Sequence, residues 1–310
     1  MILCINANAA VDKTVVVNGF RLNEIHRPQH VLAVAGGKGV NVARGLQRLG
    51  EVAVVAGWVG GFNGQFIAAG LQHEGIATAF IHTDVESRTC LSILDPEHNT
   101  LTEIYEKGEP VSAGKVAEFK QLFQAIIPEY TAVTFSGSLP PHVPTAFYGE
   151  LLELAHAAGI PGFLDSSGDA LRQGLEIGYP VLIKPNAEEF AELVNRKLER
   201  VEDIAEAAVD VAKHHGTSVA VSLGSRGVIA ANGNELLHIR PPQLIVKSAV
   251  GSGDCMLAGI TYGLMHGFSF QEAMIYGVAA GSANALTIGA GRFTMDDFEF
   301  VRSQVTVVRQ

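Results

Sequence analysis

Four residues within the C-terminal third combine two glycines, a serine and a carboxylate ahead of an apolar helical run. They read Gly251-Ser252-Gly253-Asp254, and the run continues through Ile260. Small residues let backbone N–H groups converge on an anion, and the helix dipole favours negative charge at that end. A carboxylate in the first helical turn can take a proton from a hydroxyl. The segment therefore suggests phosphoryl transfer to an alcohol, with a dipole-stabilising carboxylate in a capped helix as the alternative.

A second glycine cluster, Gly-Gly-Lys-Gly-Val-Asn-Val-Ala at 36–43, places a cation and an amide at a helix start. It is not a phosphate-binding P-loop, because it lacks that motif's first glycine and the Ser or Thr after the lysine. Gly37 permits close backbone approach to a ligand, while Lys38 and Asn41 supply charge and hydrogen bonds. The alternative is a turn with a solvated lysine.

Polar or small residues also follow two predicted strands, at the edge where open α/β sheets bind ligands. Asp12 closes the first strand segment and could accept hydrogen bonds from sugar hydroxyls, although it could equally cap a turn. The turn Ser-Gly-Ser-Leu-Pro at 136–140, which includes Ser138, suits a wall against a substrate. Alone it is only a turn signal.

Two later turns suit a nucleotide. The segment 184–189 reads Lys-Pro-Asn-Ala-Glu-Glu, and its Asn and last Glu, three apart at a helix start, could hold a hydrated Mg²⁺. The same pair is also a capping box, and both roles can coexist. The segment 222–227 reads Ser-Leu-Gly-Ser-Arg-Gly and fits nucleotide phosphates, with a hairpin turn into the next strand as the alternative.

Two arginines, Arg27 and Arg88, fall in segments that break the alternation of strands and helices. Arginine prefers bidentate contacts to phosphate, so both are candidates to bind a phosphate already present on the substrate. Either residue alone could also be a surface charge.

The composition narrows the class of protein. The chain has 310 residues, 22 basic and 32 acidic, with a formal net charge of −10, which argues against nucleic-acid binding. Its three cysteines form no framework, which is typical of reduced thiols. The N-terminus does not resemble a signal peptide, and the most apolar window contains Asp254, so we expect a cytoplasmic protein without a membrane span.

Short apolar runs alternate with helix-period segments along one predicted domain, residues 1–310. Near-continuous apolar strands between helices favour a parallel sheet covered on both faces. The predicted strands are 2–5, 52–57, 132–136, 162–165, 181–183 and 218–222, and the predicted helices are 39–49, 64–73, 145–158, 201–214, 253–266, 271–288 and 295–301.

Two stretches, about 13–35 and 88–106, alternate apolar and polar residues instead. This period predicts a small antiparallel sheet, inserted as a lid, with one face uncovered by helices. An uncovered apolar face needs a cover, either the site itself or a second subunit. A lid that also forms a homodimer would satisfy both needs.

The order of these motifs along the whole chain closely resembles the ribokinase/PfkB carbohydrate kinases. Gly-Gly-Lys-Gly-x-Asn-x-Ala at 36–43, with Lys-Pro-Asn at 184–186 and Val-Gly-Ser-Gly-Asp at 250–254, is most similar to the phosphosugar branch. That branch includes 1-phosphofructokinase, tagatose-6-phosphate kinase and the minor 6-phosphofructokinase. One departure is Ala9, where many relatives have proline before the acidic residue.

The resemblance implies an α/β fold, a ribokinase-like three-layer α/β/α sandwich with a small β-sheet lid, often dimeric through the lids. It implies ATP and Mg²⁺ as cofactors, with Asp254 as the base and Gly251, Ser252 and Gly253 as the anion cradle. The implied substrate residues are Asp12, Gly37, Lys38, Asn41, Arg88, Arg27 and Ser138; the implied nucleotide residues are Lys184, Asn186, Ser222, Gly224, Ser225, Gly227, Gly253 and Asn284; and the implied Mg²⁺-linked carboxylate is Glu189.

The resemblance further implies phosphorylation of a ketohexose monophosphate to the 1,6-bisphosphate, with fructose 1-phosphate as the first expectation. Tagatose 6-phosphate and fructose 6-phosphate remain alternatives, because each presents a phosphate and a hydroxyl at opposite ends of a similar ketose. A kinase of an unphosphorylated sugar or nucleoside is a further alternative, against which the cations at Lys38, Arg27 and Arg88 argue. A non-catalytic sugar-phosphate sensor is the last alternative, against which the intact Asp254 and glycine cradle argue.

Overall fold

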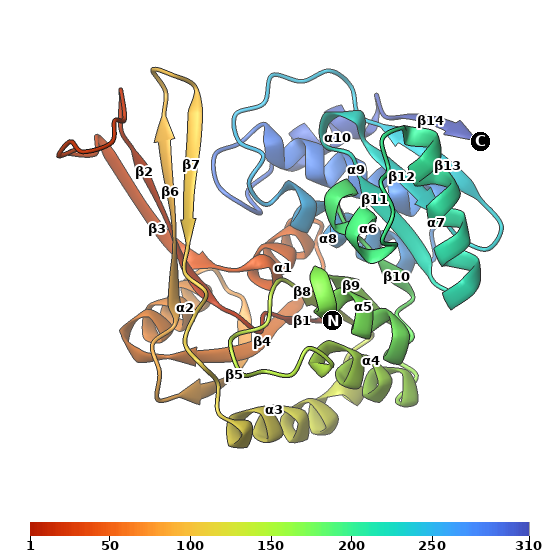
Figure 1. Ribbon diagram of the computed structural model, residues 1–310, viewed down its shortest axis with the longest axis horizontal. Helices are drawn as coiled ribbons and strands as arrows, with labels where there is room; N and C mark the ends of the chain where they lie inside the picture. The colour runs from red at the N-terminus through yellow and green to blue at the C-terminus, as the bar shows by residue number, and fades with distance from the viewer. Residues whose placement is uncertain (310) are drawn as a thin grey trace.

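A computed structural model describes residues 1–309. This part of the chain forms a large central sheet and a small sheet that stands beside it (Figure 1). From edge to edge, the large sheet contains β14 (Thr306–Arg309), β13 (Leu236–Arg240), β12 (Val228–Ala231), β11 (Ser218–Ser222), β10 (Leu182–Ile183), β9 (Gly162–Asp165), β8 (Ala132–Ser136), β1 (Ile2–Ile5), β4 (Ala53–Gly60) and β5 (Ala77–Thr83). Strands β11 to β5 are parallel, and β12, β13 and β14 add an antiparallel edge.

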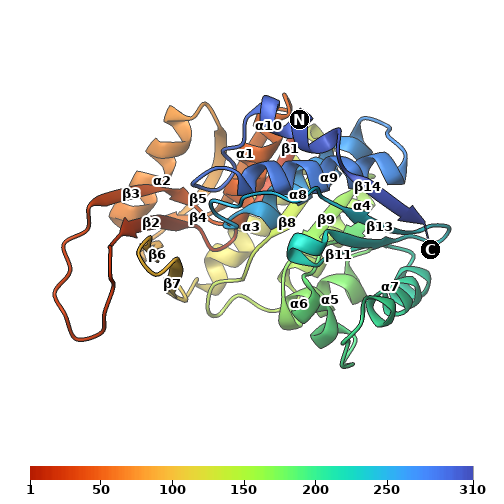
Figure 2. The same cartoon turned by 90° about the horizontal axis from the view of Figure 1, so that it is seen from above.

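Helices cover both faces of the large sheet, because its strands are apolar on both sides. In β1, Leu3 and Ile5 belong to one core and Ile2 and Cys4 to the other, and all are fully buried. One face carries α3 (Ala113–Ile126), α4 (Phe147–Ala157), α5 (Gly168–Ile177), α6 (Ala187–Leu193) and α7 (Val201–His215); the other carries α1 (Lys38–Arg48), α2 (Gly61–His73), α8 (Ser252–Met265) and α9 (Phe270–Ala285), with α10 (Met295–Arg302) against α9. Figure 2 shows these layers from above. The predicted three-layer α/β/α arrangement is therefore confirmed.

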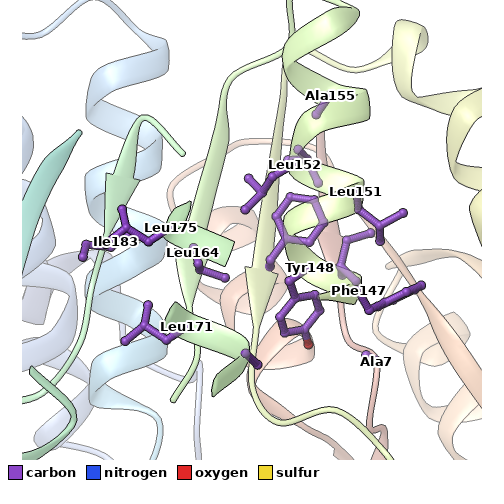
Figure 3. Packing of buried hydrophobic residues seen from close by; sticks show 14 of the residues in the cluster. Ala7, Phe147, Tyr148, Leu151, Leu152, Ala155, Leu164, Leu171, Leu175 and Ile183 are labelled. Atoms are coloured by element: carbon purple, nitrogen blue, oxygen red, sulfur yellow. The ribbon is translucent and has the colours of Figure 1, made fainter. Parts of the chain in front are cut away.

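The core of the first face forms where α4 meets the strands (Figure 3). Phe147 and Tyr148 are fully buried and pack their rings against each other, and Leu151 extends the same apolar stripe one turn later. Leu164 of β9 belongs to the same cluster. This apolar layer makes the ends of the strands a rigid platform for the polar residues that follow them.

The small sheet has the order β3 (His30–Gly36), β2 (Ala10–Val16), β6 (Arg88–Asp95) and β7 (Thr100–Tyr105). It begins at Ala10 and therefore includes Asp12, which was predicted to lie at the end of a strand of the large sheet. The outer face carries a small cluster that includes Val15 and Ile93, while α2 contacts its base. The inner face, on which Asp12 lies, turns toward the carboxyl ends of the large sheet.

Most predicted elements are confirmed, and several others were not predicted. The strands at 2–5, 132–136, 162–165 and 218–222 match to the residue. The sequence pattern predicted no element at α3, α5, β5, β13 or β14. Gly174 in the middle of α5 lowers its helix propensity, and the edge strand β14 is largely exposed and held by pairing with β13. Within residues 1–309, no helix combines the length and apolar character that crossing a membrane would need.

Candidate active site

A cleft of about 570 Å³ lies at the carboxyl ends of the parallel strands, between the large and small sheets. Residues that follow β1, β8, β9, β10 and β11 form one wall, and the start of α8 forms another. Among the predicted site residues, the cleft is lined by Asp12, Gly37, Lys38, Asn41, Arg88, Ser138, Lys184, Asn186, Glu189, Ser222, Gly251, Gly253 and Asp254. A groove of about 650 Å³ between α5, α6 and α7 contains none of these residues.

The glycine turn before α8 is shaped by backbone geometry. Gly251 has φ 77°, and a Cβ there would lie 2.3 Å from the Cβ of Ala290, so only glycine fits without strain. Ser252 begins the helix, and no side chain caps its N-terminus. Ser252 N donates to the carbonyl of Ala249 at 3.1 Å, so the N–H groups of Gly253 and Asp254 are the ones left for a ligand at the positive end of the helix.

Asn284 secures this turn instead of facing the cleft. Its side chain is fully buried, Nδ2 donates to the carbonyl of Val250 at 2.9 Å, and Oδ1 accepts from the N–H of Gly291 at 2.8 Å. Both the donor and the acceptor of this side-chain amide are therefore paired with backbone groups of the protein. Asn284 holds the loops at Val250 and Gly291 together, and its place among the nucleotide residues stays a prediction.

Asp254 lies in the first turn of α8 and is only 6% exposed. Asn41 of α1 donates to it from Nδ2 to Oδ2 at 2.8 Å. Burial raises the pKa of Asp254 to about 6, although the charges of Lys38 and Lys184 and the Asn41 hydrogen bond act in the opposite direction. A carboxylate with this pKa is ionised at neutral pH and still basic enough to accept a proton.

Asp165, which was not predicted as a site residue, joins the two lysines of the cleft. It ends β9 and is 1% exposed, with Lys184 Nζ 3.0 Å from Oδ2 and Lys38 Nζ 3.4 Å from Oδ1. Burial alone would raise the pKa of Asp165, but these two cations outweigh it and hold that pKa below its ordinary value. The three groups together carry one net positive charge. Asp165 directly follows the apolar run of its strand, so the strand-end rule that singled out Asp12 could have found it.

The two predicted phosphate-binding arginines are separated in the structure. Arg88, at the start of β6, lines the cleft and donates to the carbonyls of Asn8 and Glu106 at 3.2 and 2.9 Å. Arg27 is exposed in the loop between β2 and β3, which projects away from the body (Figure 2). This chain therefore does not bring Arg27 to the cleft. Ser138 lies beside Asn8, whose carbonyl accepts from Arg88, and Ser138 Oγ accepts from Asn8 Nδ2 at 3.2 Å.

The inner face of the small sheet contributes side chains that were not predicted to line the site. Leu101, Glu103 and Tyr105 of β7 face the cleft, as does Asp12 of β2. Burial raises the pKa of Asp12, while the backbone N–H of Gly37 and nearby arginines lower it. These residues mix apolar, acidic and hydroxyl groups, which suits a polyol with a hydrophobic edge.

On the other side of the cleft, the geometry of the segment 184–189 is compatible with both predicted roles, the capping box and the Mg²⁺ site. Asn186 Oδ1 accepts from the N–H groups of Glu188 and Glu189 at 2.9 Å, and Glu189 Oε2 accepts from Asn186 N at 2.8 Å, so the capping box is confirmed. Glu189 still lines the cleft, with Oε1 left for a hydrated cation. Residues 1–309 contain no group of three metal-ligating side chains, and Mg²⁺ needs only one or two carboxylates beside phosphates and water.

The glycine-rich turn at 222–227 contributes only Ser222 to the cleft wall. Gly224 and Ser225 are exposed in a 3₁₀ turn, Gly224–Arg226, next to it. Gly227 has a backbone reason for its identity, because a Cβ there would lie 1.9 Å from the carbonyl oxygen of Ile239. The hairpin into β12, given as the alternative, is therefore present.

The three-layer fold and a cleft that joins a glycine cradle to a buried carboxylate define a class of sugar kinases. A family model described as "pfkB family carbohydrate kinase" matches residues 4–297. The chain belongs to this family and is an ATP-dependent sugar kinase.

Solved structures narrow the similarity further. Phosphofructokinase-2 from Escherichia coli is 27% identical, with a TM-score of 0.91 over 98% of each chain. Its complex with fructose-6-phosphate superposes with a TM-score of 0.90, also at 27% identity and 98% of each chain. A Thermotoga maritima protein described as "Possible 1-phosphofructokinase" is 26% identical, with a TM-score of 0.93 over 100% of this chain and 99% of that one. The resemblance to phosphosugar kinases drawn from the motifs is thereby confirmed.

Proposed function

We propose that this enzyme transfers the γ-phosphoryl group of ATP to a free hydroxyl of a ketohexose monophosphate and releases the 1,6-bisphosphate. Fructose 1-phosphate is the first substrate to test, with fructose 6-phosphate and tagatose 6-phosphate next. The observation that carries the proposal is the meeting of the Gly251–Gly253 turn, the buried Asp254 and the Lys38–Asp165–Lys184 group in one cleft.

In this mechanism Asp254 removes the proton from the attacking hydroxyl as the new P–O bond forms. The N–H groups of the turn at 251–253 bind the oxygens of the transferring group, on which negative charge spreads. Lys38 and Lys184 pair with different oxygens of Asp165, and the single net positive charge of these three groups offsets part of that negative charge. Catalysis then comes from positioning and charge stabilisation, as in other phosphoryl transfers.

Mg²⁺ would be held through Glu189 and water, because the carboxylate keeps one oxygen clear of its capping role while facing the cleft. When bound, the ion supplies positive charge to the β- and γ-phosphates. Asn186 keeps the start of α6 rigid, so the Glu189 carboxylate is presented in one orientation.

Arg88 is the residue proposed to bind the phosphate already present on the sugar. Its guanidinium donates hydrogen bonds only to backbone carbonyls among residues 1–309, whereas Lys38 is paired with Asp165. A phosphosugar substrate is also supported by the similarity to phosphofructokinase-2, whose complex with fructose-6-phosphate is known, and to the Thermotoga protein. The two neighbours support different substrates, which is why a direct comparison is needed.

A coupled ADP-release assay with Mg·ATP tests the proposal by comparing kcat/KM for the three phosphosugars and for plain fructose. A preference of two or more decades for one phosphosugar is expected and identifies the substrate. Turnover of fructose at a similar kcat/KM would refute the role of Arg88 in favour of an unphosphorylated substrate. Absence of turnover with every sugar would favour a sensor.

We further propose a homodimer formed through the outer face of the small sheet. Val31 of β3 and Ile104 of β7 are 49% and 56% exposed on this face, beyond the base that α2 contacts. Exposed apolar strands of this kind need a cover. Phosphofructokinase-2 from Escherichia coli has a tetrameric inhibited form, which supports self-association in this family without defining its interface here.

A further inference from the structure

Arg44 is a buried cation whose hydrogen bonds converge next to the site. It lies on α1 and is 4% exposed, inside an apolar stretch of the sequence. Its guanidinium donates to Glu74 from Nε at 2.6 Å and from Nη2 at 2.8 Å, and to the carbonyl of Ala35 at 2.7 Å. The remaining nitrogen, Nη1, donates to Oδ1 of Asn41 at 3.3 Å.

This last contact decides which way the Asn41 amide faces. A guanidinium has only donors, so it requires the amide oxygen on its own side. The amide nitrogen must then face Asp254, where Nδ2 donates to Oδ2 at 2.8 Å. The flipped amide would place an oxygen against the carboxylate and an NH₂ group against the guanidinium, which are two repulsive contacts. Glu74 holds the guanidinium by two bonds and so fixes the orientation of the whole chain of contacts.

We propose that Arg44, held by Glu74, is a positioning residue that orients the Asn41 amide so that it donates to Asp254 and keeps this carboxylate ionised and aimed. This role of Arg44 rests on the proposed role of Asp254 as the base.

The charged groups around the two residues show why Arg44 acts through Asn41. Those that act on Asp254 are Lys38 of α1, Lys184 after β10 and Asp165 of β9, together with the Asn41 hydrogen bond. Arg44 instead faces three other groups, which are Glu74 at the end of α2, Asp12 of β2 and Cys255 of α8. Loss of the Asn41 hydrogen bond would favour the protonated form of Asp254, so the pKa of Asp254 would rise.

The test is the pH dependence of kcat/KM, which reports the ionisation of the free enzyme. Arg44→Lys keeps the positive charge but loses the fork that reaches Glu74, Ala35 and Asn41 together. We expect its acidic limb to move about one pH unit upward, as for loss of one hydrogen bond to a charged group. Arg48→Lys, an exposed arginine at the end of the same helix, is the matched control and should leave the limb in place. A loss of rate that is equal at every pH would overturn the proposal, because that pattern belongs to general damage.

A double-mutant cycle makes the route explicit. In an Asn41→Ala background, Arg44→Lys should move the acidic limb no further, because the group through which it acts is gone. An equal shift in both backgrounds would show that Arg44 acts on Asp254 by another path. If Arg44→Lys does not fold, Glu74→Gln weakens the same anchor more gently, and it should shift the limb in the same direction by a smaller amount. An unmoved limb in folded Glu74→Gln would then count against the proposal.

Asp254→Asn, assayed in parallel, separates the two levels of inference. Full turnover in Asp254→Asn would refute the role of Asp254 as the base, and the proposed role of Arg44 would fall with it. Lost turnover in Asp254→Asn, together with an unmoved limb in Arg44→Lys, would leave the base in place and refute only the positioning role.

Discussion

Replacing Asp254 with asparagine should abolish most of the activity while making the folded protein more stable. The substitution keeps the shape of the side chain and an oxygen that can accept from Asn41. It removes the group proposed to take the proton, which commonly costs about 10²–10⁴-fold in rate. The glycine turn at 251–253, which is proposed to bind the transferring phosphoryl group, is untouched, so KM values should change much less than kcat.

The gain in stability follows from the burial of the carboxylate. A pKa raised from 3.8 to about 6 means that the ionised form is less favourable in the folded protein than in the unfolded chain. At about 1.4 kcal/mol per unit of pKa, ionised Asp254 costs the folded state about 3 kcal/mol. A neutral amide avoids that cost, so about 3 kcal/mol is the upper bound for the gain of Asp254→Asn at neutral pH.

The stability difference between Asp254→Asn and the wild type should also depend on pH. The pKa of Asp254 is higher in the folded protein than in the unfolded chain, so the folded protein keeps this proton up to a higher pH. The stability of the folded protein therefore falls as the pH rises from about 4 to about 6. Above about pH 6 the ionised Asp254 destabilises the folded protein by the full amount, and below about pH 4 this destabilisation is absent. The advantage of Asp254→Asn over the wild type should therefore be largest at pH 7.5 and close to zero at pH 4.

Urea unfolding followed by fluorescence measures this difference, because Trp58 is the single tryptophan and is 4% exposed. Asp84→Asn, which neutralises an exposed aspartate, is the matched control and should change neither stability nor rate. Equal stability of the Asp254→Asn and wild-type proteins at pH 7.5 would refute the account of the buried carboxylate. Turnover within tenfold of the wild type would refute its role as the base.

Four other substitutions examine separate parts of the site and the assembly. Gly251→Ala should lower kcat about a hundredfold by displacing the cradle, whereas Gly159→Ala, also at positive φ but in open space, should leave kcat unchanged. Arg88→Ala should raise KM for the phosphosugar at least about tenfold and leave KM for ATP unchanged; equal effects on both would contradict phosphate binding by this residue. Glu189→Gln should raise the Mg²⁺ concentration for half-maximal rate about tenfold, and an unaltered Mg²⁺ titration would exclude it from the metal site. Val31→Lys should convert a dimer to a monomer in light scattering, and an unchanged mass would place the interface elsewhere.

The parts of the fold that the sequence predicted well are those with strong local signals. Buried strands such as Ile2–Ile5 and Ser218–Ser222 are short apolar runs bounded by polar or turn residues. By contrast, β14 has no such signal, because pairing with β13 and not local composition makes it a strand. Asp12 was assigned to the wrong sheet because the chain passes from β1 to β2 in only four residues, 6–9.

The site shows the same division between local and long-range information. Asn41, Glu189 and Asp254 stand in glycine-rich or capping motifs that are legible along the chain. Arg44 is not, because its importance depends on Glu74 from another helix, which lies 30 residues away. The role of Asn284 in holding two loops together is likewise not legible along the chain, because it depends on contacts with Val250 and Gly291.

The order of the large sheet has a consequence for how the enzyme is made. From β8 to β14 each strand lies beside its predecessor in the chain, so during synthesis every new strand meets a neighbour already present. By residue 250 all the parallel strands have been made, but α8 has not. That helix must return to pack against α1, which is made before most strands of the large sheet. A nascent chain stopped at residue 250 would thus have every strand of the large sheet except β14, an apolar face that still lacks α8 and α9, and no Asp254. The proposed base is therefore made only after every parallel strand of the large sheet.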